Sequence, residues 1–118
     1  MERDLLGLRP EPERAIDIEA PAALIARTQL PSGEIPWCDG QKTDPWDHVE
    51  AAMGLGIDGR REAARKAFQW LAGVQLHDGS WYSAYRQGRV QDRTRDANMT
   101  AYVAVGVYHH YLLTGDSG

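Results

Sequence analysis

The segment 97–113 carries no formally charged side chain and has apolar groups on every side. A helix of this kind is normally surrounded by protein, because a surface helix keeps a polar face for water. The segment from Pro45 to about Leu55 is similar, since its polar side chains are confined to its first turns. At 118 residues the chain has room for one domain. We therefore expect an architecture in which two apolar helices lie inside.

Periodicity and capping residues predict four helices, at about 16–29, 45–55, 60–75 and 97–113. Asp44 caps the second helix, whose first position is proline, and Asp96 caps the fourth. The third helix has a charged face, as an outer helix does, so we expect the order outer, inner, outer, inner. Strand alternation is unconvincing everywhere, and only 81–85 comes close to it. The predicted fold class is all-α.

Composition and charge narrow the classes of function. A net charge of −4 argues against a nucleic-acid partner, which needs a positive field. The chain has no apolar run long enough to span a membrane and one cysteine, Cys38, which fits a cytoplasmic location. We expect no cofactor, and no metal because His109 and His110 lack partners at ligand spacing. Residues 1–15, rich in charge and proline, are predicted to be a loosely ordered leader before a folded segment at 16–118.

The chain also repeats itself. Each copy ends an outer helix with glutamine, turns at glycine and places a tryptophan, through Gln29, Gly33 and Trp37 in the first copy and Gln75, Asp78, Gly79 and Trp81 in the second. An aspartate cap and an apolar helix follow each time, with a glycine ten residues after the cap. The repeat predicts two consecutive helical hairpins. Trp37 and Trp81 are either staples that fix loop to helix or platforms for a substrate.

The run Gln75-Leu76-His77-Asp78-Gly79-Ser80-Trp81 resembles the glutamine-to-tryptophan motif of the prenyltransferase and squalene-cyclase repeat family. The stretches 43–53 and 96–104 extend the likeness, which spans Gln29 to Asp116. Members of that family are α/α toroids of about six hairpins, whose inner helices present their N-terminal ends to a central cavity. The resemblance implies two αα-hairpins of a partial toroid, which binds an isoprenoid or another apolar small molecule once the ring is complete.

The best candidate site lies at the start of the second helix. Asp47 and Glu50 are three residues apart, so they share a helix face and are candidates for a general acid and base. The candidate substrate-binding residues are Asp44, Trp46, His48, Asp96 and Asn98. The alternative is that the acids only cap their helices and complement the helix dipoles.

Two hairpins are about a third of such a ring, so their apolar faces need a cover. We expect a homo-oligomer, in its sharpest form a trimer, or a missing C-terminal portion. Two other functions remain open. The chain is either a non-catalytic interaction or scaffold module, including a gene fragment, or part of a carbohydrate-active α/α toroid.

Overall fold

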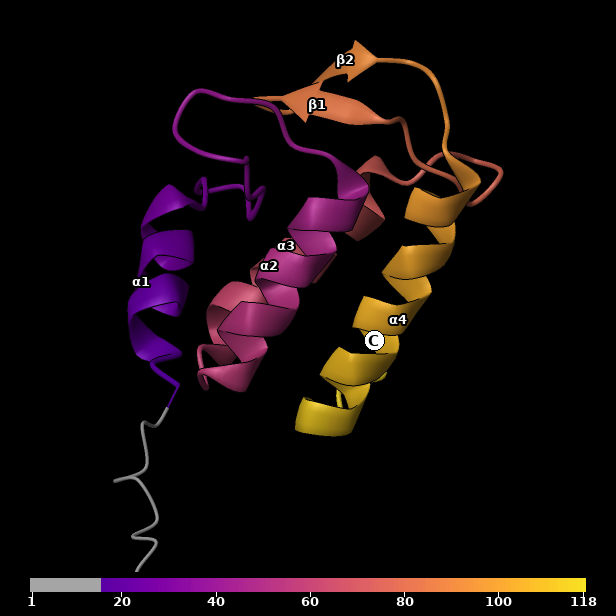
Figure 1. Cartoon of the computed structure of the whole chain (residues 1–118). Coiled ribbons are helices and arrows are strands. Elements are labelled where there is room, and N and C mark those ends of the chain that lie inside the picture. The colour runs from indigo at the N-terminus through magenta and orange to yellow at the C-terminus, as the bar shows by residue number, and fades with distance from the viewer. Residues whose placement is uncertain (1–15) are drawn as a thin grey trace, which may run out of the picture.

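The computed structural model describes residues 16–118, so the predicted leader at 1–15 lies outside the described residues. The helices are α1 (Glu19–Thr28), α2 (Pro45–Ile57), α3 (Arg61–Val74) and α4 (Ala97–Thr114), with a hairpin of β1 (Ala84–Arg86) and β2 (Arg89–Asp92) between the last two. Helices α1 and α3 run toward the end of the molecule that carries the β-hairpin, and α2 and α4 start there and run away (Figure 1). Consecutive helices thus alternate in direction.

The four helices predicted from the sequence are present, with ends within three residues of those expected. Asp44 caps α2 by accepting a hydrogen bond from the backbone N–H of Asp47, and Pro45 occupies the first position. Asp96 caps α4 in the same way through the N–H groups of two residues. These caps satisfy backbone donors that the first helical turn leaves free, which is why local sequence predicts the helix starts well.

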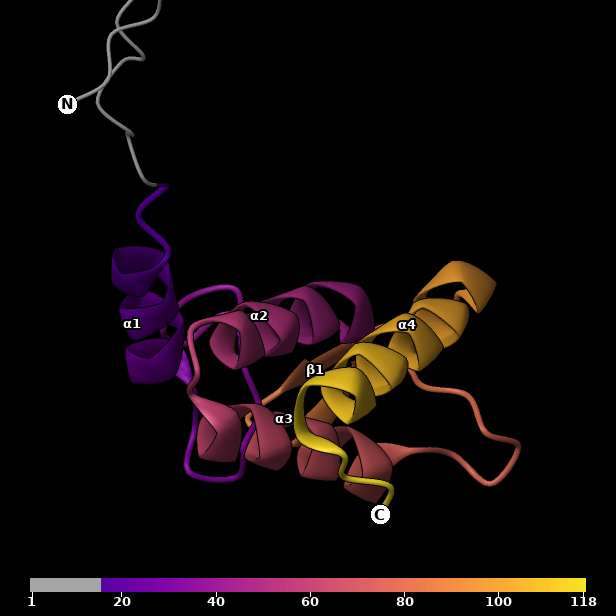
Figure 2. The same ribbon diagram turned by 90° about the horizontal axis from the view of Figure 1, so that it is seen from below.

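Helix α2 is the centre of the molecule. It packs against each of the other helices, and its Val49, Ala52 and Leu55 have no exposed surface. Seen from below, α2 and α4 lie side by side, and α3 lies along one side of both (Figure 2). Gly106 permits this approach of α4, because a Cβ at that position would overlap the Cγ1 atom of Val49.

The prediction of an all-α chain is correct for most of the molecule and wrong for the loop after α3. Tyr85 pairs with Val90 in an antiparallel ladder, and Gln87 and Gly88 form the tip with positive φ angles of 49° and 77°. Such a tip suits a two-residue hairpin turn. The strands are three and four residues long and rich in charge, so they lack the alternation that reveals a strand in a sequence.

The β-hairpin is tied to the first loop at two places. Thr43 and Tyr85 exchange a pair of backbone hydrogen bonds, each 2.8 Å long. At the tip, the Gly88 N–H donates to Oε1 of the buried Glu34 at 3.0 Å. The loops of the two predicted hairpins therefore form one connected layer at one end of the helices.

The glutamine-to-glycine turns of the two copies have the same geometry. Gln29 Nε2 donates to the Gly33 carbonyl at 3.1 Å, and Gln75 Nε2 donates to the Gly79 carbonyl at 3.0 Å. The buried Trp81 follows Gln75 by six residues. In the first copy, the residue six positions after Gln29 is Ile35, which is 4% exposed. Trp37 is two residues further on and 55% exposed, so the tryptophans that the sequence aligned are not equivalent.

Residues 16–118 cover helix α4 on one flank only. Gly106 and Val103 face the other helices, whereas six large apolar side chains are 40–63% exposed: Val105, Val107, Tyr108, Tyr111, Leu112 and Leu113. The expectation that α4 is surrounded by protein is thus not met by residues 16–118 themselves. Within these residues, no helix is both long enough and apolar enough to cross a membrane.

Candidate functional site

The acidic residues predicted from the sequence gather at the N-terminal end of α2. Asp44 is 5% exposed and uses both carboxylate oxygens, since Oδ1 accepts from the Asp47 N–H at 2.9 Å and Oδ2 accepts from Trp37 Nε1 at 2.6 Å. An acid with both oxygens engaged in this way is a structural anchor. Asp44 therefore holds the Trp37 indole over the start of the helix.

Asp47 is exposed beside this buried anchor. Partial desolvation raises the pKa of Asp47, and the charge of Asp44, a side-chain hydrogen bond with Asp44 and the charge of Glu50 raise it further, against the opposing charge of Lys42. A carboxyl that keeps its proton to higher pH is suited to general acid catalysis. Asp47 is thus the acid of this site whose surroundings favour proton donation.

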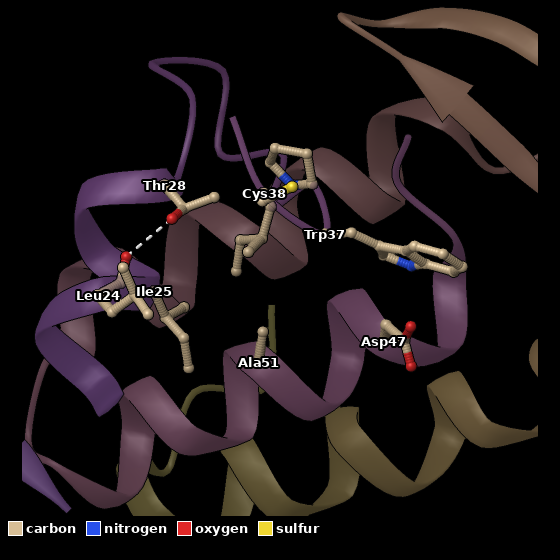
Figure 3. Close-up of a pocket in the computed structure, with 9 residues that line it drawn as sticks. Leu24, Ile25, Thr28, Trp37, Cys38, Asp47 and Ala51 are labelled. Atoms are coloured by element: carbon tan, nitrogen blue, oxygen red, sulfur yellow. Dashed lines mark hydrogen bonds between the residues drawn. The ribbon is translucent and has the colours of Figure 1, made fainter. Parts of the chain in front are cut away.

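A pocket of about 280 Å³ opens between α1 and α2 next to Asp47. Figure 3 shows Asp47 at one end of it, near the Trp37 ring, and the α1 side chains Leu24 and Ile25 at the other. Its remaining wall is mostly apolar and comes from the first loop, Ala51 and Thr28 at the end of α1. The pocket thus combines a protonatable acid, an indole and an apolar wall.

Two aromatic rings stack where α2 faces α4. The Trp46 and Tyr102 rings lie 4.2 Å apart between centroids and 5° from parallel, which joins the first turn of α2 to α4. Trp46 Nε1 donates to Glu50 Oε1 at 2.9 Å. Desolvation, followed by the charge of Glu50 and a hydrogen bond to it, raises the pKa of Tyr102. Glu50 therefore holds the polar edges of both rings.

His48 points into the interior and has no exposed surface. Its Nδ1 accepts from the Ile35 N–H at 3.1 Å and its Nε2 donates to the Ala67 carbonyl at 2.9 Å, which assigns the proton to Nε2. Burial lowers the pKa of His48 to about 4, so the ring is neutral at neutral pH. With both nitrogens occupied by backbone groups, His48 links the first loop to α3 and is not open to a substrate.

The corresponding residues of α4 are exposed. Asp96 Oδ1 accepts from the Asn98 N–H at 2.7 Å and the Met99 N–H at 3.2 Å, so it acts as the helix cap. The Asn98 side chain makes no hydrogen bond within the described residues, and α4 starts at the same end of the molecule as α2 (Figure 1). In the loop before it, Arg95 is paired with Asp78 at 2.6 Å, which fixes the approach to α4.

The structure brings Trp37, Asp47 and Glu50 to one end of the bundle and adds Tyr102, which the sequence reasoning did not select. Tyr102 follows the cap Asp96 by six residues, as Glu50 follows Asp44, so the repeat contained a signal for it. Within 16–118, no three His, Cys, Asp or Glu side chains are grouped so that they could hold a metal ion.

No protein-family model matches the chain. Over 95 residues, 80% of the chain, the sequence is 54% identical to a protein of Mycolicibacterium hassiacum named MMP endo-(1,4)-3-O-methyl-alpha-D-mannosidase. The chain spans about a quarter of that protein, 26% of its length. A stretch of 95 residues in a chain of 118 necessarily includes residues 24–95, so the acids of α2 lie inside the matched part.

This similarity corrects the family resemblance inferred from the sequence. The relative is named as a mannosidase, so the assignment to the prenyltransferase and squalene-cyclase repeat family is wrong, and so is the isoprenoid-binding function drawn from it. The motif misled because it reflects local geometry. In both copies the glutamine amide closes a turn whose glycine has a positive φ angle, and this requirement of the backbone is independent of the substrate.

Proposed function

We propose that this chain forms part of the sugar-binding and catalytic site of a glycoside hydrolase that acts on 1,4-linked 3-O-methyl-α-D-mannose chains. The observation that carries the proposal is the 54% identity to a protein named for that activity, over a stretch that includes the acids of α2. It corresponds to the carbohydrate-active alternative left open by the sequence. Because the chain spans a quarter of that relative, the activity of the whole protein is part of the proposal.

Asp47 is the proposed general acid. Glycoside hydrolysis needs a carboxylic acid that protonates the oxygen of the leaving sugar, and a second carboxylate on the opposite side of the bond. Asp47 is exposed, and its raised pKa favours the protonated form that the first role requires. Glu50 is three residues further along the same helix, so it lies on the same side of any bound sugar as Asp47. The opposing carboxylate therefore comes from outside this pair.

Glu50 is the proposed positioning residue. It accepts a hydrogen bond from Trp46 and raises the pKa of Tyr102 by its charge and hydrogen bond, so it orients the stacked rings. Aromatic rings pack against the apolar C–H face of a sugar while their polar edges stay hydrated. A methyl ether adds apolar surface to the sugar, which favours an aromatic wall over one made of hydrogen-bond donors. We assign the Trp46–Tyr102 pair as this wall.

For the architecture, we propose that α1–α2 and α3–α4 are two successive hairpins of an α/α toroid. The common direction of α2 and α4 (Figure 1), with α3 packed along one side of both (Figure 2), supports this arrangement. The exposed apolar flank of α4 supports the need for more hairpins, from a longer polypeptide or from other copies of the chain.

The test uses the indole N–H signals of the four tryptophans, recorded by NMR during titration with a 1,4-linked 3-O-methyl-α-mannose oligosaccharide. The Trp46 signal should shift, and the Trp81 signal should not, because that indole is buried and donates to the Leu71 carbonyl at 2.8 Å. A Trp46→Phe variant assigns the signal. The Tyr102→Ala variant should bind the sugar at least tenfold more weakly, whereas Tyr108→Ala, on an exposed flank, should bind it normally.

Catalysis is tested separately by release of shorter oligosaccharides from the same substrate. The Asp47→Asn variant should retain binding and lose turnover, because the amide cannot supply the proton. Indole signals that stay unchanged at millimolar sugar would contradict the proposal and favour the interaction-module alternative. Full turnover by the Asp47→Asn variant would remove Asp47 from the catalytic role.

A further inference from the structure

Helix α3 packs on the first hairpin, which contacts the backbone of residues 63–67. We call the surface of the hairpin that receives this helix the seat. Gln29 Nε2 donates to the carbonyl oxygen of Ala63 at 2.9 Å, and His48 Nε2 donates to that of Ala67 at 2.9 Å. Both donors belong to the repeat, one at the end of α1 and the other in the first turn of α2. The seat therefore recognises the backbone of an outer helix at two points.

The same seat requires small side chains on both partners. Gly33 lies so close to the carbonyl group of Lys66 that a Cβ would overlap it. The alanines that α3 presents, Ala64 and Ala67, are fully buried. Ala52, also fully buried, lies opposite them on α2 in the same cluster. The close approach of α3 follows from these small residues.

The second hairpin carries an equivalent set of positions. The loop from Trp81 to Asp96 is six residues longer than that from Ile35 to Asp44, because it contains the β-hairpin. Beyond the loops, equivalent positions are counted from the two helix caps, Asp44 and Asp96. The seat residues of the first hairpin are Gln29, Gly33, Ile35, His48, Ala52 and Leu55. Their equivalents are Gln75, Gly79, Trp81, Thr100, Ala104 and Val107. All six equivalents line a single cavity of about 370 Å³ between α3 and α4.

This second seat is empty in the part of the chain that the structure describes. Leu55 is completely buried under α3, whereas its equivalent Val107 is 50% exposed. Gln75 bonds to the Gly79 carbonyl and, within residues 16–118, reaches no following helix as Gln29 does. Among the residues that the structure describes, the one atom within 4 Å of a Gly79 Cβ beyond its chain neighbours is Nε2 of Gln75, at 3.8 Å.

We propose that the cavity between α3 and α4 is the seat of a third outer helix, which carries small side chains at two positions three residues apart. It belongs to a further hairpin of a longer polypeptide, for which a relative about four times the matched length has room. A second copy of this chain is a poor occupant. Its free outer helix is α1, where the positions of Ala64 and Ala67 are taken by Ile18, the N-cap residue, and by Pro21. The inference concerns the interface and is independent of the sugar chemistry.

The probe is a peptide with the sequence of residues 60–75, blocked at both ends, added to the isotope-labelled 118-residue chain. Backbone amide signals of Gly79, Thr100 and Val107 should shift in a saturable manner. A peptide with Ala64→Ile and Ala67→Ile should cause no shift, because the two larger side chains prevent close approach. In the protein, Ala104→Gln should abolish the response, whereas Ala101→Gln, exposed and outside this cavity, should leave it intact.

Three results would overturn the proposal. The first is an absence of shifts with the peptide at millimolar concentration while circular dichroism shows the protein to be folded. The second is equal binding of the isoleucine peptide, which would show non-specific association with an apolar surface. The third is a set of shifts at the same cavity and on α1 that depends on protein concentration without peptide, which would identify a second copy as the occupant.

Discussion

Gly106 of α4 lies directly against Val49 of α2, with no room for a Cβ between them. Gly106→Ala should therefore destabilise the protein by about 1–3 kcal/mol through overpacking, the more so because the Phe68 ring is 3.2 Å from the same position. Gly73→Ala is the matched control, since that helical glycine has open space around it. This variant should be more stable than the parent by up to about 1 kcal/mol, because alanine favours the helix more than glycine does.

Urea denaturation of both variants measures these opposite changes. The double variant Gly106→Ala with Val49→Ala should recover part of the loss, because the second change removes the overlapping methyl groups. If the Gly106→Ala variant were as stable as the parent, α4 would not be packed closely against α2.

His48 should make the protein sensitive to acid. Its pKa is lowered to about 4 by burial, whereas the unfolded imidazole takes up a proton near pH 6.5, so the unfolded state gains the proton first as pH falls. The free energy of unfolding should drop by about 3 kcal/mol between about pH 6.5 and pH 4. Denaturation curves at several pH values across this window test it.

The His48→Gln variant should be less stable at neutral pH and should lose most of this pH dependence. The matched control is His77→Gln, a change at an exposed position in the loop after α3. If the free energy of unfolding of the His48→Gln variant fell with pH as steeply as that of the parent, other groups would be responsible for the acid sensitivity.

The carboxyl of Asp47 should titrate above its ordinary value of 3.8 in carbon-detected NMR, owing first to partial burial and next to Asp44. Asp44→Asn removes the neighbouring charge while leaving a side chain that still caps a helix, so the pKa of Asp47 should fall. Lys42→Met should raise it, because the lysine charge favours the ionised form. Shifts in the same direction in both variants would refute the electrostatic account.

The two repeat glutamines should differ in their contribution to stability. Gln29 makes two part-buried hydrogen bonds, to the Gly33 and Ala63 carbonyls, whereas Gln75 makes one in an exposed position. Gln29→Ala should cost about 1–2 kcal/mol and Gln75→Ala less than about 1 kcal/mol. Thermal unfolding of the two variants gives the comparison, and equal losses would show that the contact with α3 contributes nothing.

The helices could be predicted from the sequence because their signals are local. Asp44 followed by Pro45, and Asp96 before an uncharged run, each specify a helix start within a few residues. The clustering of Asp47 and Glu50 follows from helical spacing alone. The β-hairpin escaped prediction because its pairing with Thr43 joins segments distant in sequence, and three-residue strands have too few positions to show a pattern.

The roles of the site residues depended on contacts that spacing does not reveal. In the sequence His48 looks like Asp47, a polar residue in a first turn, yet the backbone of α3 makes it interior. Tyr102 joins the site because α4 lies alongside α2, which Gly106 permits. The proposed substrate class likewise depends on the similarity to a named mannosidase and not on the repeat, since the repeat specifies turns and packing.

The β-hairpin is fastened at its base by the Thr43–Tyr85 pair and at its tip by Glu34. Moving the hairpin away would break these three hydrogen bonds at once and would leave the buried Glu34 carboxylate without its donor. The hairpin is therefore held in place and does not act as a hinged lid. The β-hairpin and the first loop therefore form a rim of fixed shape at the end of the bundle where the acids of α2 lie.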